Sequence, residues 1–257
     1  MLAITRKTKI KEMISTKKSV TVSELANMFH VTEETIRRDL QQLENEGLLK
    51  RIYGGAYIDE VVQGDVDIKL REKIMVKDKE IIANECAKLV KNGESIFLDA
   101  STTSLYIATK IKNKKLTVIT NSLKIANLLS GLENIKLLLI GGILDSNSMS
   151  LLGKNAQNDM KQYFVDKAFI SCRSINLISG ITDSNEQQAE VRKLAIQHSN
   201  LTYLVVDHTK FDKTSFAYIA DLKEIDAIVV NKSLTEAWVN ALKENNIELI
   251  GPVNNSV

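Results

Sequence analysis

The strongest constraint on the fold is the alternation of short apolar runs with amphipathic helical patterns from residue 77 onward. Residues 135–140, for example, are apolar at every position except Lys136, as expected of a strand that is buried on both faces. The predicted strands are 95–98, 116–120, 135–140, 167–172, 201–206, 227–230 and 247–250, and the predicted helices are 77–91, 102–112, 123–129, 155–164, 186–199 and 234–243. Apolar strands separated by helices favour a mainly parallel sheet covered on both faces, so we predict an α/β domain over residues 76–257.

Residues 32–46 predict a helix with two unlike faces. Ile36, Leu40 and Leu43 lie together on a helical wheel, and long polar side chains occupy the opposite face. Thr32 is suited to cap the start of this helix, because its hydroxyl can accept a hydrogen bond from a free backbone N–H group of the first turn. An ordinary surface helix has the same pattern, so the neighbouring sequence decides between the two interpretations.

A shorter amphipathic helix is predicted at residues 22–29, and only His30 and Val31 separate it from residue 32. Two helices joined by such a short turn predict a helix-turn-helix, whose second helix enters the major groove of DNA. Arginine can bond guanine through two atoms, glutamine can do the same with adenine, and a threonine methyl can contact thymine. The predicted base-reading residues are therefore Thr35, Arg38, Gln41 and Gln42. Arg37 lies on the flank of the helix, where it would contact the DNA backbone or pair with an acidic neighbour.

Two further segments complete the predicted DNA-binding head, residues 1–58. Residues 3–17 form a supporting helix, and the side chains expected in its buried stripe are Ile4, Ile10, Met13 and Ile14. Residues 48–57 predict two short strands around a glycine pair, a wing in which Lys50 and Arg51 would contact phosphates rather than bases. The head would thus combine a helix that reads sequence with a wing that supplies charge.

The charge distribution agrees with a basic head on a near-neutral body. Residues 1–58 contain ten Lys and Arg against seven Asp and Glu, a net charge of +3, whereas the whole chain has +2 and the remainder therefore −1. Such an asymmetry is typical of a DNA-binding module attached to a different kind of domain. In residues 59–75 the hydrophobic pattern weakens and the charges alternate, which predicts a linker whose second half, 68–74, is helical.

Small and polar residues follow three of the predicted strands. They are Asp99, Ser101, Thr102 and Thr103 after the first strand, Asn121 and Ser122 after the second, and Gly141 and Gly142 after the third. Ligands of open α/β sheets bind beyond the carboxyl ends of the strands, and a helix start with hydroxyl groups suits a phosphate or carboxylate. A simple helix cap would account for the first group alone, so the repetition at three strand ends favours a ligand site. Lys210, after a later strand, and Glu190, near the start of a helix, are further candidates.

The chain resembles the DeoR-type bacterial transcriptional regulators. In the head the similar motifs are V-x-x-L-A-x-x-F-x-V at residues 22–31, T-I-R-R-D-L at 35–40, G-L-L at 47–49 and R-x-Y-G-G-A at 51–56, in which Tyr53 stands where the family usually has His. In the body they are D-x-S-T-T at 99–103, T-N-S at 120–122, G-G at 141–142, A-F-I at 168–170 and D-x-x-K-F at 207–211. The resemblance implies a body fold similar to that of ribose-5-phosphate isomerases and coenzyme A transferases, and a phosphorylated sugar as its ligand. The chain departs from the family at residues 171–174, where Ser-Cys-Arg-Ser replaces the usual glycines and Arg173 would add an anion contact or fill the site.

These observations predict a transcriptional regulator, a repressor of a sugar-metabolism operon, whose operator affinity changes when a phosphorylated sugar binds the body. Because operators commonly repeat a half-site, we expect a homo-oligomer, a dimer or tetramer. One alternative is a sugar-phosphate isomerase-like enzyme with an accessory DNA-binding head, in which Asp99, Glu190 and Lys210 would form an acid/base set. Another is a DNA-binding protein whose body only oligomerises. No second catalytic signature accompanies the first alternative, so we expect no enzymatic activity.

The sequence also gives no indication of disulfides, bound metals, a signal peptide or a membrane segment. Cys86 and Cys172 are the only cysteines and lie far apart, so we expect neither a disulfide framework nor a metal-ligand cluster, and no cofactor. The first residues become charged too early for a signal peptide, and no apolar run reaches about 18 residues. We therefore expect a cytoplasmic protein without a membrane partner.

Overall fold

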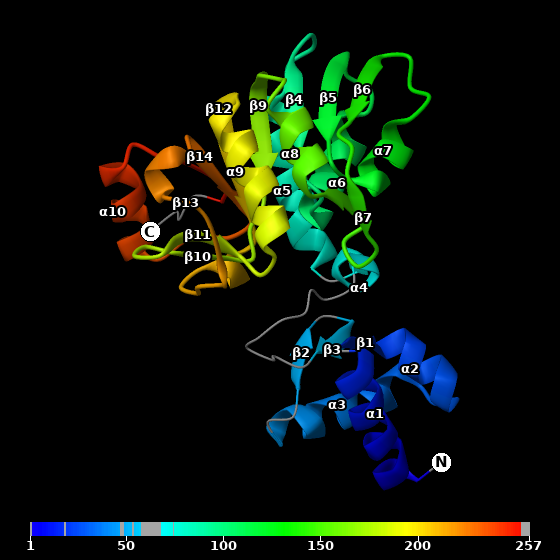
Figure 1. The fold of residues 1–257 in the computed structure, drawn as a ribbon. Helices are drawn as coiled ribbons and strands as arrows, with labels where there is room; N and C mark the ends of the chain where they lie inside the picture. The colour runs from blue at the N-terminus through cyan, green and yellow to red at the C-terminus, as the bar shows by residue number, and fades with distance from the viewer. Residues whose placement is uncertain are drawn as a thin grey trace. The chain divides into compact units, whose positions relative to one another are not determined.

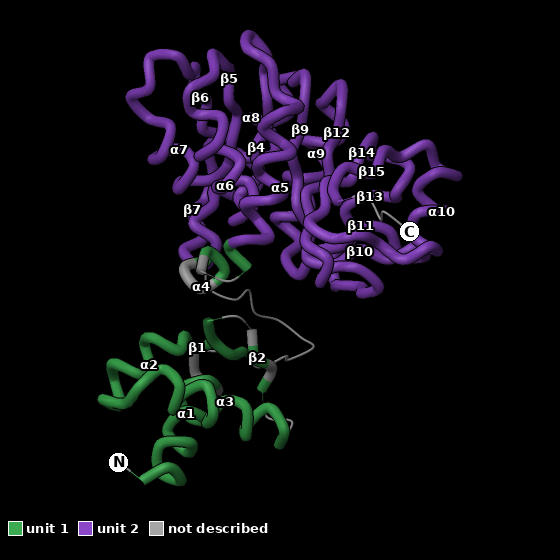
Figure 2. The backbone as a smooth tube through the Cα atoms, turned by 180° about the vertical axis from the view of Figure 1, so that it is seen from behind, with its two compact units in different colours: residues 1–76 green, residues 77–257 purple. Residues whose placement is uncertain are grey.

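The computed structural model describes residues 2–17, 19–46, 49–52, 54–57, 68–73 and 75–252. The chain divides into two compact units, residues 1–76 and 77–257, and each unit is described by itself (Figure 2). Most of the predicted linker and three motif residues, Gly47, Leu48 and Tyr53, lie outside the described residues. The helix expected in the second half of the linker is present as α4 (Ile68–Lys73). No helix within the described ranges is long and apolar enough to cross a membrane.

The described residues of the N-terminal unit form α4, three further helices and a three-stranded antiparallel sheet (Figure 1). The helices α1 (Ala3–Lys17), α2 (Val22–Phe29) and α3 (Glu33–Asn45) confirm the three predicted helices. The hydroxyl of Thr32 accepts a hydrogen bond from the Thr35 amide and caps α3, as predicted. The strands β2 (Lys50–Ile52) and β3 (Gly55–Tyr57) form the predicted wing, and β1 (Ser19–Thr21) pairs with β3. We did not predict β1, because three residues are too few to show the alternation of a strand.

The helices of this unit enclose a small apolar core. Ile10, Ile14, Leu25, Ile36 and Leu40 are among its fully buried members. The prediction that Ile4 belongs to the buried stripe of α1 was wrong, since this residue is 78% exposed. At about 100° per residue, position 4 lies some 120° away from Ile10, whereas position 6 lies on the buried face. That position is occupied by Arg6, which is buried.

Seven parallel strands form the central sheet of the C-terminal unit (Figure 1). In spatial order they are β15 (Glu248–Ile250), β14 (Ala227–Val230), β12 (Ser199–Val206), β9 (Val165–Ile170), β4 (Ser95–Leu98), β5 (Leu116–Thr120) and β6 (Ile135–Leu139). The predicted α/β fold is thereby confirmed, and no strand boundary differs from its prediction by more than two residues. The strand order reverses beside β4, because β5 and β6 follow on one side and β9, β12, β14 and β15 on the other.

Helices cover both faces of this sheet. One face is covered by α5 (Val76–Leu89), α6 (Thr102–Ile111) and α7 (Leu123–Leu129), and the other by α8 (Lys154–Met160), α9 (Glu186–Gln197) and α10 (Glu236–Glu244). Successive side chains of a strand point to opposite faces, so Ile96 and Leu98 of β4 join the first layer and Phe97 joins the second. The helix α8 ends four residues earlier than predicted, and Phe164, in the predicted extension, is exposed.

Short antiparallel strands that we did not predict accompany the main sheet. The hairpin of β7 (Ile143–Asp145) and β8 (Ser150–Leu152) follows β6, and a small sheet contains β10 (Ser174–Asn176), β11 (Gly180–Asp183) and β13 (Ala217–Ala220). Two 3-10 turns, η1 (His208–Lys210) and η2 (Leu222–Glu224), follow β12 and β13. Segments of three or four residues are too short to show a period of two, so the sequence did not separate them from loops.

Candidate DNA-binding surface and ligand site

The helix α3 exposes the polar face that was predicted to read bases. The side chain of Arg38 is 78% exposed, and its Nε atom lies 3.7 Å from Glu34 Oε1. Thr35 is half-buried, and its hydroxyl oxygen lies 2.9 Å from that of Thr32. Arg38 is therefore a predicted base-reading residue whose side chain extends into solvent.

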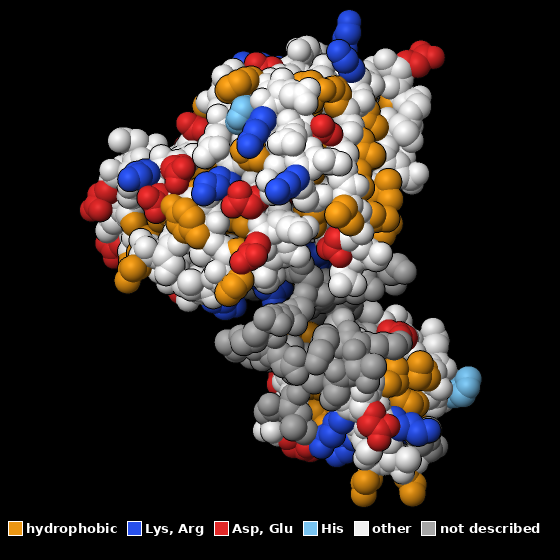
Figure 3. Space-filling view, in the orientation of Figure 1, with side chains coloured by type: hydrophobic (Ala, Val, Ile, Leu, Met, Phe, Trp, Pro, Cys, Tyr) orange, Lys and Arg blue, Asp and Glu red, His pale blue; other side chains and the backbone are white. Residues whose placement is uncertain are grey.

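The other described candidates of the head have partners within the protein. The contacts are Arg37 Nη2 to Glu33 Oε2 at 2.6 Å, Gln41 Nε2 to Asn45 Oδ1 at 3.1 Å, Lys7 Nζ to Gln42 Oε1 at 2.9 Å and Arg51 Nε to Glu44 Oε2 at 2.8 Å. The contacts of Arg37 and Arg51 are ion pairs at the surface, where Lys and Arg lie beside Asp and Glu on the face of this unit that Figure 3 shows. Such pairs stabilise a protein by about 0–1 kcal/mol each, so a DNA phosphate can displace them at little cost. The side chain of Lys50 lies outside the described residues.

A buried ion pair, which the sequence did not reveal to us, joins α1 to α3. Arg6 donates from Nε to Asp39 Oδ2 at 2.5 Å and from Nη2 to Asp39 Oδ1 at 3.2 Å. Two parallel hydrogen bonds between planar groups fix their relative orientation, so this pair sets the direction of α3 against α1. The available signal was the position of Asp39 on the apolar side of the helical wheel, about 40° from Leu43 and about 60° from Ile36.

In the C-terminal unit, the predicted ligand-site residues come from strand ends that lie side by side. The strands β9, β4, β5 and β6 are consecutive parallel neighbours, so their carboxyl ends meet at one edge of the sheet. The Ser171 amide after β9 donates to Asp99 Oδ2 after β4 at 2.9 Å. The hydroxyl of Thr120, at the end of β5, donates to the Leu98 carbonyl at 2.6 Å. The reversal of strand order between β4 and β9 lies at the same edge, and ligands of open α/β sheets bind at such a point.

The start of α6 and the end of β5 supply the polar groups of this edge. Ser101 caps α6 by accepting a hydrogen bond from the Ser104 amide at 3.0 Å. The amides of Thr102 and Thr103 occupy the first turn, where N–H groups have no partner within the helix and the helix dipole is positive. Asn121 is 1% exposed, and its Oδ1 atom accepts no hydrogen bond from any described residue. A hydroxyl donor would satisfy this acceptor, and an anion would satisfy the helix start.

Asp99 lies beneath this edge with both carboxylate oxygens occupied. The Oδ1 atom accepts from the Ser101 amide at 3.2 Å and from the Ser104 hydroxyl at 2.6 Å. The Oδ2 atom accepts from the Ser171 amide and, at 2.8 Å, from Arg192 Nε. Burial opposes ionisation of this carboxyl, but the Arg192 charge and these hydrogen bonds outweigh it and lower the pKa of Asp99. Asp99 therefore holds its loop in place and presents no unoccupied oxygen.

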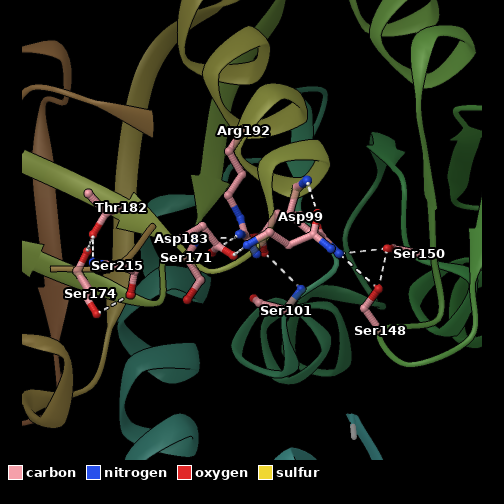
Figure 4. A network of polar contacts seen from close by, with 12 residues as sticks. Asp99, Ser101, Ser148, Ser150, Ser171, Ser174, Thr182, Asp183, Arg192 and Ser215 are labelled. Carbon is pink, nitrogen blue, oxygen red and sulfur yellow. Dashed lines mark hydrogen bonds and ion pairs between the residues drawn. The ribbon is translucent and has the colours of Figure 1, made fainter. Parts of the chain in front are cut away.

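The guanidinium of Arg192 is buried between two carboxylates (Figure 4). Figure 4 shows Asp99 and Asp183 converging on Arg192, whose Nη1 atom donates to Asp183 while Nε donates to Asp99. These groups come from the loop after β4, the end of β11 and the middle of α9. One cation thus joins β11 and α9, which are neighbours in the sequence, to the loop after β4, which lies 93 positions before Arg192.

Gln188, one helical turn before Arg192, joins α9 to the β7–β8 hairpin by hydrogen bonds. Its Nε2 atom donates to the hydroxyls of Ser148 at 3.0 Å and Ser150 at 2.8 Å. Gln188 and Arg192 are four residues apart and therefore share one face of α9, where both are buried. We predicted neither residue, although two long polar side chains on the apolar face of a predicted helix were a visible signal.

Glu190 is not brought to the strand ends. Its side chain is exposed, on the side of α9 opposite to Gln188 and Arg192. The acid/base set of Asp99, Glu190 and Lys210 considered for an enzyme is therefore not assembled. Among the described residues, no group of three or more His, Cys, Asp or Glu has an arrangement that could hold a metal ion.

The remaining candidates lie beside the same edge. Lys210 is half-buried in η1, after β12. Burial opposes ionisation of the neighbouring Asp207, but the Lys210 charge and hydrogen bonds from Thr209 lower the pKa of Asp207. Arg173 is half-buried two residues after Ser171. Both cations follow strands that are neighbours in the sheet, β12 and β9.

Packing within the protein accounts for the glycine pair after β6. The Gly141 amide donates to Asp159 Oδ2 at 2.7 Å. Gly142 has a φ of +140°, and a Cβ atom at this position would lie 2.4 Å from the Leu152 carbonyl oxygen. The absence of a side chain at Gly142 is therefore required by the β7–β8 hairpin, and its contact with a ligand stays a prediction.

Comparisons with known proteins agree with this arrangement of two units. Residues 6–62 match the family model of the DeoR-like helix-turn-helix domain, and residues 74–232 match that of the DeoR C terminal sensor domain. The chain is 41% identical to an uncharacterized HTH-type transcriptional regulator, YulB, of Bacillus subtilis over 97% of its own length and 96% of that protein. It is 33% identical to the HTH-type transcriptional repressor GlcR of Bacillus subtilis, over 90% of this chain and 89% of that one. It is 29% identical to a putative aga operon transcriptional repressor of Escherichia coli O157:H7, over 95% and 92% of the two chains.

A similarity to solved structures is more distant. Ribose 5-phosphate isomerase A of Methanocaldococcus jannaschii aligns with 52% of this chain and 53% of its own, at 19% identity and a TM-score of 0.38. A similarity of this size carries no argument about the function of the chain.

The fold and the family matches define a DNA-binding transcriptional regulator, in which a helix-turn-helix unit is joined to a parallel α/β sensor domain. Within that class, the chain belongs to the DeoR family. The relatives named above are transcriptional regulators, and the resemblance noted in the sequence motifs is confirmed.

Proposed function

We propose that this chain represses a sugar-metabolism operon and that a phosphorylated sugar, bound at the strand-end edge of the sensor domain, changes its affinity for operator DNA. Two of the similar proteins are named as repressors, and one of these names refers to an operon. The proposal assigns base reading to α3 and phosphate contacts to the wing.

The observation that carries the ligand site is the start of α6 beside the reversal of strand order. The first-turn amides of α6 and the hydroxyls of Ser101, Thr102 and Thr103 suit a phosphate group. The buried Asn121 Oδ1 atom has no donor among the described residues, and a sugar hydroxyl would supply one. Arg173 and Lys210 would add positive charge from the two neighbouring strand ends. Ser122 caps α7 at the next strand end and completes the proposed set.

The direct test measures operator binding with and without phosphorylated sugars. Fluorescence anisotropy with DNA from upstream of the chain's own gene should show nanomolar binding that one member of a panel weakens. The couplings between sites in proteins are typically about 5–150-fold in affinity, so a change in this range is expected. Thermal unfolding with the same panel separates this proposal from a body that only oligomerises. No stabilisation by any phosphorylated sugar would count against the ligand site.

Base reading by α3 has a test of its own. Arg38→Ala should weaken binding to the operator more than binding to random-sequence DNA, because a base contact carries sequence information. Lys50→Ala should weaken both alike, because a phosphate contact does not. Competition titrations with both DNAs measure the two losses. Equal losses for Arg38→Ala on operator and random DNA would remove the base-reading assignment.

We also propose that the functional form is a homo-oligomer, a dimer or tetramer. A repeated half-site requires two heads at a fixed spacing, and one chain supplies a single helix-turn-helix. Light scattering at the concentrations used for DNA binding measures the mass directly. A monomer on an operator with two half-sites would contradict this part of the proposal.

A further inference from the structure

Asn231, the residue that follows β14, uses all of its amide group to join two distant segments. Its Oδ1 atom accepts a hydrogen bond from the His208 amide at 2.8 Å. Its Nδ2 atom donates to Asp78 Oδ1 at 2.6 Å and lies 3.1 Å from His208 Nδ1. The side chain is 3% exposed, so water does not replace these partners. Asp78 and Asn231 are separated by 153 positions in the sequence.

The partners fix the orientation of the Asn231 amide. A carboxylate at Asp78 can only accept, and the His208 backbone amide can only donate, so the oxygen and nitrogen of Asn231 cannot be exchanged. A neutral imidazole accepts at one nitrogen only, so the contact of Asn231 Nδ2 with Nδ1 and the contact of Lys232 Nζ with Nε2, at 3.2 Å, belong to opposite tautomers of His208. The hydrogen bond from the His208 backbone amide to Asn231 Oδ1 does not depend on the tautomer.

The two joined segments have different places in the proposed regulation. His208 begins the η1 turn, which also contains Lys210, one of the proposed phosphate contacts. Asp78 lies in the first turn of α5, two residues after the boundary between the units. The chain that enters from the DNA-binding unit therefore becomes part of the sensor domain at the residue that Asn231 holds.

We propose that Asn231 is a positioning residue that couples the η1 turn to the start of α5. This inference rests on the proposed function, because it assigns a route by which a ligand at Lys210 alters the segment leading to the head. A displacement of η1 moves the His208 amide and ring together, and Asn231 can follow them only by losing its bond to Asp78. Two ligand states that differ at η1 then differ at the start of α5, as coupling between sites requires.

Hydrogen exchange in the full-length chain tests the coupling without any ligand. His208→Pro, which removes both the ring and the backbone donor to Asn231, and Asn231→Ala should each speed amide exchange in the second turn of α5, residues 80–83, by about tenfold, because local opening becomes easier when the first turn loses its anchor. The double variant should show no further increase. Lys232→Ala, the matched control beside the same ring, should leave α5 unchanged. Unchanged exchange in α5 for both single variants, or effects that multiply in the double variant, would overturn the proposal.

Variants of Asp78 separate the hydrogen bond from the charge at the start of the helix. Asp78→Asn keeps an oxygen that accepts from Asn231 and should exchange like the wild type, whereas Asp78→Ala should exchange about tenfold faster. Faster exchange in both variants would assign the effect to the helix dipole and would overturn the coupling role. Asp78 is half-buried, so these variants are expected to fold even where Asn231→Ala does not.

Operator binding then shows whether the coupling serves regulation. The probes are glucose 6-phosphate, ribose 5-phosphate and inorganic phosphate. Asp78→Ala should bind operator DNA as tightly as the wild type, and it should show the same thermal shift with the active sugar phosphate. It should lose only the effect of that ligand on operator affinity. A wild type that responds to none of these probes counts against the proposed function alone, because the exchange experiment decides on the coupling. An Asp78→Ala protein that still releases operator with ligand, to the same extent as the wild type, would overturn the inferred route.

Discussion

Replacing Arg192 by methionine should strongly destabilise the sensor domain. Methionine fills most of the volume of the arginine stem but removes the cation between Asp99 and Asp183, both of which are buried. Removing one partner of a buried ion pair typically costs about 3–5 kcal/mol, since the remaining charge has neither water nor a counter-ion. For a domain of 150–250 residues, 1 kcal/mol corresponds to about 2–4 °C in Tm, so a loss of roughly 6–20 °C is expected.

The single tryptophan makes this loss measurable in the full-length chain. Trp238 is buried in the C-terminal unit, and its ring packs edge-on against Phe211 with 4.9 Å between centroids. Tryptophan emission therefore follows the unfolding of this unit and not that of the head. Urea titrations followed by tryptophan emission give the free energy of unfolding of the sensor domain for the wild type and the variant. Lys193→Met is the matched control on the same helix, and its effect should stay within about 0.5 kcal/mol.

The pH dependence of the loss gives a second test of the same reasoning. In the wild type the pKa of Asp99 is lowered from its ordinary value of 3.8, so its contribution to stability is present above that pH and disappears as the pH falls through the lowered value. In Arg192→Met the cation is absent, and burial instead raises the pKa of Asp99 above its ordinary value. A raised pKa destabilises the folded chain only at pH values where the carboxyl of the unfolded chain is ionised. The deficit of the variant should therefore shrink as the pH falls from neutrality toward the ordinary pKa of 3.8. A loss below about 1 kcal/mol, or a deficit independent of pH, would refute this account of Arg192.

Three further predictions concern other parts of the molecule. Burial raises the pKa of the Cys172 thiol to about 12, so iodoacetamide at pH 8 should modify this residue only after unfolding. Mass spectrometry measures the extent of modification. Modification of the folded chain at the rate of a free thiol would contradict the burial of Cys172. Gly142→Ala should destabilise the sensor domain by about 1–3 kcal/mol. Gly153→Ala should destabilise it less, because the space around Gly153 is open. Equal losses of unfolding free energy in urea titrations would show that the contact between Gly142 and the hairpin is unimportant. Arg6→Met should destabilise the head by about 3–5 kcal/mol, measured by circular dichroism, because it leaves Asp39 buried without its partner; an unchanged head transition would contradict that role.

The sequence was sufficient for the main elements of both units because their signals are local. The strands β4, β5 and β14 begin and end at the predicted residues, since each is an apolar run bounded by polar residues. The helix α2 is also found at its predicted residues, where the apolar period and the threonine before it agree. The error at Ile4 has the same origin: we grouped an apolar residue with its neighbours, although the helical period assigns the buried position to Arg6.

The candidate site was predictable only in part, because its supporting contacts join residues that are distant in the sequence. Arg192 meets Asp99 across 93 positions, and Gln188 meets Ser148 across 40. No spacing rule relates such residues, since the sheet order that brings them together is itself a product of folding. The hydroxyl and glycine motifs marked the edge of the sheet, but they did not show which of their members hold the edge together.

Asp99 illustrates how a motif residue can belong to a ligand site without meeting the ligand. Its four hydrogen bonds position Ser101, the cap of α6, and Ser171, after the next strand. On our proposal the phosphate meets the first-turn amides of α6, so the carboxylate acts one layer below, by fixing the direction of that helix start. A free carboxylate at this place would repel the anion, whereas one held by Arg192 is largely neutralised and does not. The buried arginine thus stabilises the fold and also allows an acidic residue to lie beneath an anion site.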